Sequence, residues 1–391
     1  MSTSQPAYRS LIIIVASFCL SIIFLKLFVN SSGDHKPLED AALLEGTTVI
    51  RGEVDGKLVH CFNRNDADLC LNNIDKEKIV LWLGNSQLHS INQISPNDQP
   101  SSALLHQKIL ADGRYLVTFS QANANLQEHL ILASFMINKF DIDMLLLPVF
   151  FDDLREDGVR LSIMDFFNFE NAPSASSEFF RSLLENGPKS SHFDEISDDN
   201  AFKEPGIVDM EALDGTPQKI VEAYLTSELS KVSRVWQMQG EIRGQFLISL
   251  YKLRNYIFGI DASSIRKSIP VRYKKNMQAL SEILLLAENN GVEILLYIPP
   301  LRNDFKRPYD EQEYREFKKE VENLASIYKV QFSDLEGLVP NELWGMKDST
   351  ALDIDSGDEL DFMHFQMGGH TLLADKLYFL INGKRDLGDI K

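Results

Sequence analysis

Two stretches that lie far apart in the chain carry the side-chain types needed for activated-serine chemistry. Ser86 stands in the turn Gly84-Asn85-Ser86-Gln87 after an apolar run, and Asp361 and His364 stand near the end of the chain. A serine hydroxyl becomes a strong nucleophile when a histidine takes its proton, and a carboxylate can hold that histidine in the correct tautomer. We therefore predict Ser86 as the nucleophile, His364 as the base and Asp361 as the orienting group. Because Asp361 precedes His364 by three residues, we expect both on one loop or helical turn.

Each of these residues also has a structural alternative. Serine is a residue type that caps helix N-termini, and Asp361 with His364 could be an ordinary hydrogen-bonded loop pair. His89 is interpreted as a surface or packing histidine, and His370 as a structural one. The sequence contains no Cys/His cluster and no His-Glu-x-x-His stretch, so we expect neither a metal nor another cofactor.

Apolar runs that alternate with helical patterns must position these side chains. Such alternation predicts an α/β fold with a doubly wound parallel sheet. Ligands of these sheets bind beyond the carboxyl ends of the strands, where Ser86, Asp152 and Pro299 fall. The pair Asp55-Gly56 predicts a hairpin turn. Strands are expected at 78–83, 114–119, 144–150, 292–298 and 330–332, and helices at 126–138, 276–290 and 309–328 and from Gln87 onward.

The two motifs resemble those of the SGNH/GDSL hydrolases. Gly84-Asn85-Ser86 is similar to the Gly-Asp-Ser turn of that family. Asp361-Phe362-Met363-His364, followed by Gly368-Gly369-His370, is similar to its Asp-x-x-His block. The resemblance covers roughly residues 76–382. It implies an SGNH-hydrolase-like three-layer sandwich in which a serine carries an acyl group.

Two departures from the family concern the groups that bind an oxyanion. The segment 120–125 stands where the family has a glycine, and Phe150-Phe151-Asp152-Asp153 replaces its Gly-x-Asn-Asp. An ionised Asp152 would repel an oxyanion, and a helix cap or a salt bridge is its alternative role. Arg302 could be a surface arginine of a loop instead of a substrate contact. The candidates for oxyanion or substrate contacts are Asn123, Asn125, Asp152 and Arg302, together with the backbone N–H of Ser86.

The N-terminal region predicts a membrane anchor. Residues 11–29 are almost wholly apolar, a run of about the length that spans a bilayer as a helix, and the flanking charges place the N-terminus in the cytosol. A cleaved signal peptide is the alternative. The predicted organisation is a cytosolic tail at 1–9, a transmembrane anchor at 10–30, a linker and N-terminal extension at 31–75, an SGNH-like domain at 76–382 with a helical insertion at about 160–235, and a tail at 383–391.

The net charge bears on the binding partners of the protein, and its cysteines bear on the cellular compartment. The net charge of −18 argues against nucleic acid as a partner. Cys61 and Cys70 would both be exported with the domain, to the periplasm or the cell exterior, where they could form a disulfide. Two free buried thiols are the alternative.

The resemblance extends to one branch of the family, because the chain combines an anchor, an exported domain and altered oxyanion positions. The chain looks like the membrane-anchored members that act on cell-envelope polymers, such as the D-alanyl-transfer protein of teichoic-acid modification and the alginate-type O-acetyltransferase proteins. This resemblance implies a polytopic membrane-bound O-acyltransferase as partner and an envelope polysaccharide as substrate, with Ser86 passing an acyl group to a sugar hydroxyl. The same chemistry with water makes an exported carbohydrate esterase. A catalytically silent scaffold is the third alternative.

Overall fold

The computed structural model of the chain describes residues 47–62, 64–72, 74, 78–164, 166, 178–185, 253–259, 264–347 and 359–383. The chain divides into two compact units, 1–41 with 196–251 and 42–195 with 252–391, and the described residues all belong to the second unit. The predicted cytosolic tail and anchor, and most of the predicted insertion, lie outside the described residues. Within the described ranges, no helix combines the length and the apolar character needed to cross a bilayer.

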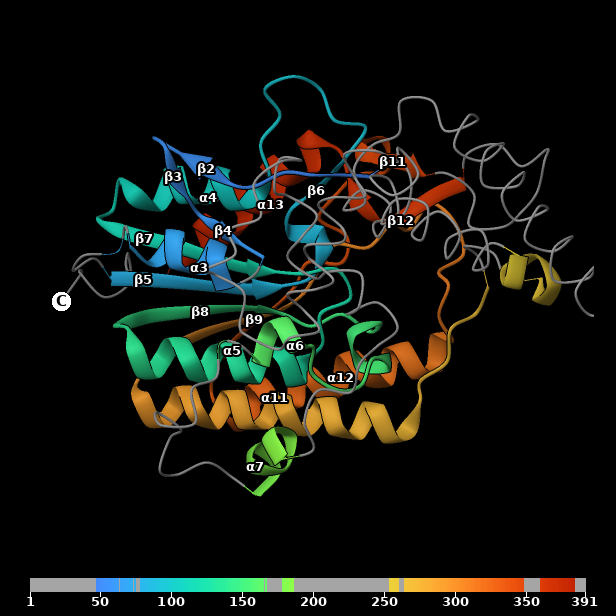
Figure 1. The fold of residues 1–391 in the computed structure, drawn as a ribbon. Coiled ribbons are helices and arrows are strands. Elements are labelled where there is room, and N and C mark those ends of the chain that lie inside the picture. The colour runs from blue at the N-terminus through green and yellow to red at the C-terminus, as the bar shows by residue number, and fades with distance from the viewer. Residues whose placement is uncertain are drawn as a thin grey trace, which may run out of the picture. The chain divides into compact units, whose positions relative to one another are not determined.

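A six-stranded parallel sheet forms the centre of the second unit (Figure 1). Its strand order is β10-β9-β8-β5-β7-β4, so β7 and β8 flank β5 on opposite sides. Strand β7 is thus added on one side of β5, and β8, β9 and β10 are added on the other. The carboxyl end of β5 lies at this switch point in strand order, where parallel sheets bind ligands. The predicted strands are confirmed. The bounds are β4 His60–Cys61, β5 Lys78–Gly84, β7 Arg114–Ser120, β8 Ile142–Pro148, β9 Glu293–Ile298 and β10 Gln331–Asp334.

Helices cover both faces of this sheet (Figure 1). Side chains of a strand alternate between the two faces, and β5 shows this directly. Ile79, Leu81 and Leu83 join the core under α5 (Leu126–Lys139), α11 (Pro270–Asn290) and α12 (Glu311–Ile327). Val80 and Trp82 join the core under α4 (Ser101–Leu110) and α13 (Met367–Asn382). The chain thus has the predicted α/β fold with helices on both faces of a parallel sheet.

The segment after Ser86 differs from the predicted helix. A short 3-10 helix, η1 (Ser86–Leu88), ends at His89, and the chain continues as strand β6 (Ser90–Asn92). This strand pairs antiparallel with β1 (Thr47–Val49), which is more than 40 residues earlier in the sequence. A regular helix, α4, begins only at Ser101. The prediction was wrong because pairing with a distant strand, which local sequence does not reveal, overrides local helix propensity.

Two smaller predictions on the N-terminal side are settled by the structure. Strands β2 (Glu53–Val54) and β3 (Lys57–Leu58) form the predicted hairpin. Asp55 and Gly56 both have positive φ, 53° and 74°, as a two-residue type I′ turn requires. Cys61 at the end of β4 is bonded to Cys70 in α3 (Arg64–Leu71). The alternative of two free thiols is therefore wrong.

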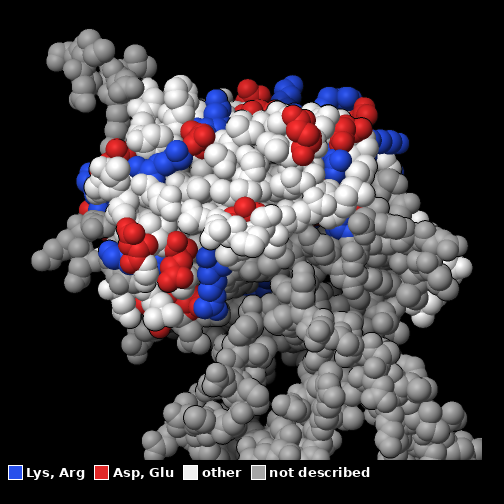
Figure 2. All heavy atoms as spheres, turned by 90° about the horizontal axis from the view of Figure 1, so that it is seen from above, with Lys and Arg blue, Asp and Glu red and all other residues white. Residues whose placement is uncertain are grey.

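The surface of the described part mixes both signs of charge. Seen from above, acidic and basic side chains stand side by side over the described face (Figure 2). Ion pairs among the described residues include Lys108 with Asp375 at 2.8 Å and Lys318 with Glu336 at 2.6 Å.

Candidate active site

Ser86 lies in a tight turn at the carboxyl end of β5. The side chain of Asn85 caps this turn, because its Oδ1 accepts the N–H of Gln87 at 3.1 Å. Gly84 is required just before it, since a Cβ there would lie 2.5 Å from a methyl carbon of Leu88. The Ser86 side chain is thereby held at the switch point of the sheet, and the residue is 8% exposed. Ser86 is the first residue of η1, so its N–H is not used by the helix's own hydrogen bonds.

Asp361 and His364 lie in strand β12 (Glu359–Phe365), and not in the expected loop or helical turn. This strand pairs antiparallel with β11 (Trp344–Lys347), but the register shifts, so that residues 361–364 stand opposite Gly345 alone. Oδ1 of Asp361 accepts the N–H groups of Met363 and His364 at 2.9 and 3.0 Å. These two bonds fold the four residues into a bulge, which brings a carboxylate and an imidazole three positions apart to the same side.

The three predicted residues form a continuous hydrogen-bonded chain. Ser86 Oγ lies 2.9 Å from His364 Nε2, and His364 Nδ1 lies 3.0 Å from Asp361 Oδ2. All three are buried, with His364 3% and Asp361 1% exposed. Burial alone would raise the pKa of Asp361, but His364, Lys347 and the N–H of Met363 lower it to about 2. An ionised Asp361 makes Nδ1 the protonated nitrogen of neutral His364 and leaves Nε2 free to accept the Ser86 proton.

Two amides that the sequence analysis did not single out hold these parts together. Asn92 Nδ2, at the end of β6, donates to Asp361 Oδ2 at 3.1 Å. Gly345 leaves the space for it, because a Cβ there would fall 1.9 Å from Asn92 Oδ1. Gln87 Nε2 donates to the carbonyls of Met363 and Pro300 at 2.7 and 2.9 Å. Both amides are buried in the structure, and no sequence signal separates them from ordinary polar residues.

Arg302 supports the same region from below the bulge and is not a surface arginine. Its guanidinium donates to the carbonyl of Gly345 at 2.8 Å and to that of Asp361 at 3.4 Å. It also pairs with Asp304 at 2.7 Å. The residue is buried, and its backbone N–H bonds the carbonyl of Phe362. The Arg302 guanidinium therefore holds the backbone around Asp361, and its role as a substrate contact stays a prediction.

The other candidate oxyanion residues have different positions. Asn125 caps α5 through Gln127 and Glu128, and its Nδ2 donates to the carbonyl of Gly158. Asp152 binds Arg266 at 2.7 Å and also Arg155 and Tyr309, which is the salt-bridge alternative. Both side chains thus serve local structure, and their oxyanion roles stay predictions. Asn123 is exposed with a φ of 54°, and its role stays a prediction.

His89 and His370 are structural, as predicted. His89 Nδ1 lies 2.6 Å from Ser120 Oγ, which in turn donates to the carbonyl of Asn85. Because that hydroxyl uses its proton on Asn85, His89 must donate through Nδ1. Burial, with smaller effects from other histidines, lowers the pKa of His89 well below 6.5. His370 contacts the N–H of Ser101 and the carbonyl of Ser90, and burial lowers its pKa to about 3.

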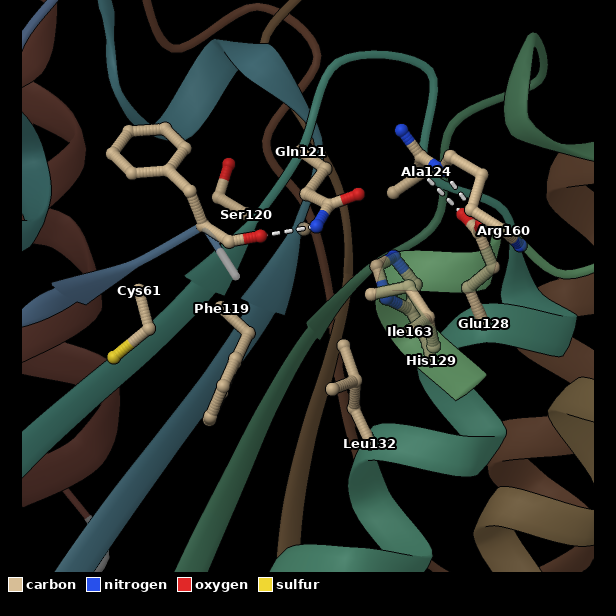
Figure 3. A pocket seen from close by; sticks show the side chains of 12 residues that line it. Cys61, Phe119, Ser120, Gln121, Ala124, Glu128, His129, Leu132, Arg160 and Ile163 are labelled. Carbon is tan, nitrogen blue, oxygen red and sulfur yellow. Dashed lines mark hydrogen bonds and ion pairs between the residues drawn. The ribbon is translucent and has the colours of Figure 1, made fainter. Parts of the chain in front are cut away.

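A small pocket lies beside the nucleophile turn (Figure 3). It is bounded by Gly84, the loop after β7 and the first turns of α5, and its volume of about 10 Å³ is small. Glu128 and Arg160 form an ion pair of 2.6 Å at its edge. Ser86, His364 and Asp361 are not part of its lining, so this pocket is separate from the triad. In the part of the chain that is described, no three His, Cys, Asp or Glu side chains are placed to hold a metal ion.

Comparison with known proteins gives structural likenesses and no sequence match. No protein-family model matches the chain, and no curated protein matches it significantly. It is similar to a GDSL-like lipase from Parabacteroides merdae, with 11% identity, a TM-score of 0.37, and 80% of this chain and 98% of that chain covered. It is also similar to an acylhydrolase from Bacteroides fragilis, with 8% identity, a TM-score of 0.34 and coverages of 80% and 92%.

A third similar structure is an acetylxylan esterase from Geobacillus stearothermophilus, with 10% identity, a TM-score of 0.33 and coverages of 78% and 94%. At such identities and TM-scores these likenesses do not decide the activity of this chain. The chain resembles the SGNH/GDSL hydrolases in its motifs, and GDSL-like lipases and an acetylxylan esterase are among the solved structures to which it is similar.

Proposed function

We propose that this chain is a serine-dependent acyl-transfer enzyme in which Ser86 carries the acyl group. The observation that carries the proposal is the unbroken chain from Asp361 through His364 to Ser86, with hydrogen-bonding distances of 3.0 and 2.9 Å. A structural loop pair would not need a serine hydroxyl at the imidazole's second nitrogen, at the switch point of a parallel sheet. The assembled triad also argues against a catalytically silent scaffold.

The geometry supports a two-step reaction. In the first step His364 Nε2 takes the proton of Ser86 while Oγ attacks the acyl carbonyl carbon, and the imidazolium returns this proton to the departing oxygen. Asp361, which is ionised, stabilises the imidazolium between these events. In the second step a hydroxyl gives its proton to His364 and attacks the acyl-serine carbonyl carbon; the bond to Oγ breaks, and the imidazolium gives its proton to Oγ, which restores Ser86. The backbone N–H of Ser86 is suited to bind the negative oxygen in both steps.

We propose further that the acceptor is a hydroxyl of an envelope polysaccharide and that residues 10–30 anchor the protein, with the domain in the periplasm or outside the cell. The apolar run in the sequence supports the anchor. The bond between Cys61 and Cys70 supports an oxidising compartment. A polytopic membrane-bound O-acyltransferase is the partner that would bring the acyl group across the membrane. Nucleic acid is not a partner in this proposal, because of the acidic chain.

The test uses the full-length protein and a short acyl ester as donor, with a polysaccharide present or absent. Intact-mass analysis should find an acyl group on Ser86, and Ser86→Ala should abolish both this adduct and product formation. Ser90→Ala is the matched control, because Ser90 is buried nearby and its Oγ has no bonding partner among the described residues. An acylated polysaccharide supports the transferase. Release of free acid alone identifies an esterase, and an inert wild type contradicts the proposal.

A further inference from the structure

The position of Ser86 depends on a second carboxyl group, from the loop after β8. Asn85 Oδ1 accepts the N–H of Gln87, so its Nδ2 must face the other way. There it donates to Oδ1 of Asp153 at 3.0 Å. Asn85 is 4% and Asp153 2% exposed. Asn85 caps the turn that begins with Ser86, so Asp153 holds the amide that holds the nucleophile turn.

Asp153 lies in a place that disfavours negative charge. Its Oδ2 is buried and has no hydrogen-bond partner among the residues that the structure describes. Burial raises the pKa of Asp153 well above its ordinary value, and Asp152 and Glu156 add to this, while the bond from Asn85 and the N–H of Phe150 oppose it. A buried carboxylate with one oxygen unbonded costs far more than a neutral acid.

The cations near Asp153 are engaged with other groups. Arg155 and Arg266 pair with Asp152. Helix α11 packs on the same loop, and its cationic side chains there have other partners. Lys275 pairs with Asp157, and Arg272 donates to the carbonyl of Arg155. These contacts leave Asn85 as the side chain that bonds Asp153 in the described structure.

We propose that Asp153 is a positioning residue that works as a neutral acid, with its proton on Oδ2, orienting Asn85 and keeping negative charge away from the oxyanion that forms at Ser86. The role rests on the proposed acyl transfer. It also accounts for an acidic segment beside the site. Asp152 turns to Arg266 and Tyr309, and Asp153 presents an uncharged acceptor to Asn85.

The first test measures the proton without using activity. Full-length wild type, Asp153→Asn and the matched control Asp157→Asn are unfolded with denaturant between pH 5 and 8. The aspartate is ionised once the chain unfolds, whereas native Asp153 keeps its proton, so this group releases a proton on unfolding. The unfolding equilibrium constant of the wild type should rise about tenfold more per pH unit than that of Asp153→Asn, and Asp157→Asn should follow the wild type. Equal slopes for wild type and Asp153→Asn would mean an ionised Asp153 and would overturn the proposal.

The second test compares kcat on a short acyl ester. Asp153→Asn keeps a neutral acceptor for Asn85, so its kcat should stay near that of the wild type and persist to higher pH. Asp153→Leu leaves the Asn85 amide without an acceptor and should lower kcat about tenfold or more at an unchanged KM. Loss of activity in Asp153→Asn equal to that in Asp153→Leu would overturn the proposal. A wild type without activity contradicts the proposed function alone, and the unfolding slopes still decide the charge of Asp153.

Discussion

Lowering the pH from 7 to 5 should destabilise the described domain steeply, because the domain buries histidines in their neutral form. Burial is the main cause in each case and lowers the pKa of His60 and His370 to about 3 and that of His106 and His129 to about 4. The pKa of His89 is also lowered well below 6.5. The unfolded chain protonates all of these side chains below pH 6.5, and the native domain does not, so acid favours unfolding.

The magnitude follows from the pKa values. A histidine with a native pKa of 3 or 4 and an unfolded pKa of 6.5 loses roughly 2 kcal/mol of stability between pH 7 and pH 5. Four such groups together lose about 7 kcal/mol. Asp153 has a raised native pKa, so it acts in the opposite direction, by at most about 3 kcal/mol over these two pH units. The remaining loss of about 4 kcal/mol is a large part of a typical unfolding free energy of about 5–15 kcal/mol.

The assay is denaturant unfolding of the full-length protein at pH 7, 6, 5.5 and 5. The midpoint concentration should fall with pH at a nearly constant slope m. His129→Leu is the informative variant, because neither ring nitrogen of His129 has a hydrogen-bond partner among the described residues. It should be about as stable as the wild type at pH 7 and lose roughly 2 kcal/mol less on going to pH 5. Equal stability at pH 7 and 5, or an unchanged loss in His129→Leu, would refute the reasoning.

Three further predictions concern the triad and the disulfide. Asp361→Asn should lower kcat by about 10⁴ at an unchanged fold, because the tautomer of His364 is no longer set; a loss under tenfold would contradict the assigned role. Gly345→Ala should lower kcat about tenfold or more with little change in KM, because a Cβ would displace the Asn92 amide from Asp361. Gly337→Ala is the control, because a Cβ added there has open space. Replacing both Cys61 and Cys70 by Ser should lower the unfolding free energy by about 2–3 kcal/mol relative to the disulfide-bonded wild type, as measured by denaturant unfolding, and the reduced wild type should match the variant.

The strands of the central sheet could be predicted because each is recognisable from its own residues. Strands of a parallel sheet are buried on both faces and appear as continuous apolar runs, and β5, in which residues 79–83 are all apolar and buried, is the clearest case. The segment after Ser86 could not be predicted, because the partner of β6 is β1, far away in the sequence. Spacing alone identified Asp361 and His364, but it could not show that a register shift against Gly345 produces their geometry.

The supporting residues were beyond sequence reasoning for a related reason. Gln87, Asn92 and Asp153 are ordinary polar residues in the sequence, and their roles arise only from partners up to 276 positions away. Arg302 is a candidate because it could reach an anionic substrate group, and Asn125 because its amide could bind an oxyanion. In the structure the backbone around Asp361 accepts from Arg302, and the carbonyl of Gly158 accepts from Asn125. Residue types identify side chains that could bind a substrate or an oxyanion. They do not show which of these side chains already have hydrogen-bond partners in the fold.

The nucleophile and the base belong to different sheets. Ser86 follows β5 of the six-stranded sheet, whereas His364 lies in the two-stranded sheet of β11 and β12. Core packing of residues such as Phe362 and Phe365 holds the two-stranded sheet in the domain, and side chains such as Gln87 align the two sheets near the site through hydrogen bonds. Loss of one such hydrogen bond would therefore abolish the reaction while the core packing, and with it the fold, is kept. A variant that lacks such a hydrogen bond would melt at the temperature of the wild type and still be inactive. A screen for thermal stability would therefore accept proteins that no longer catalyse the reaction.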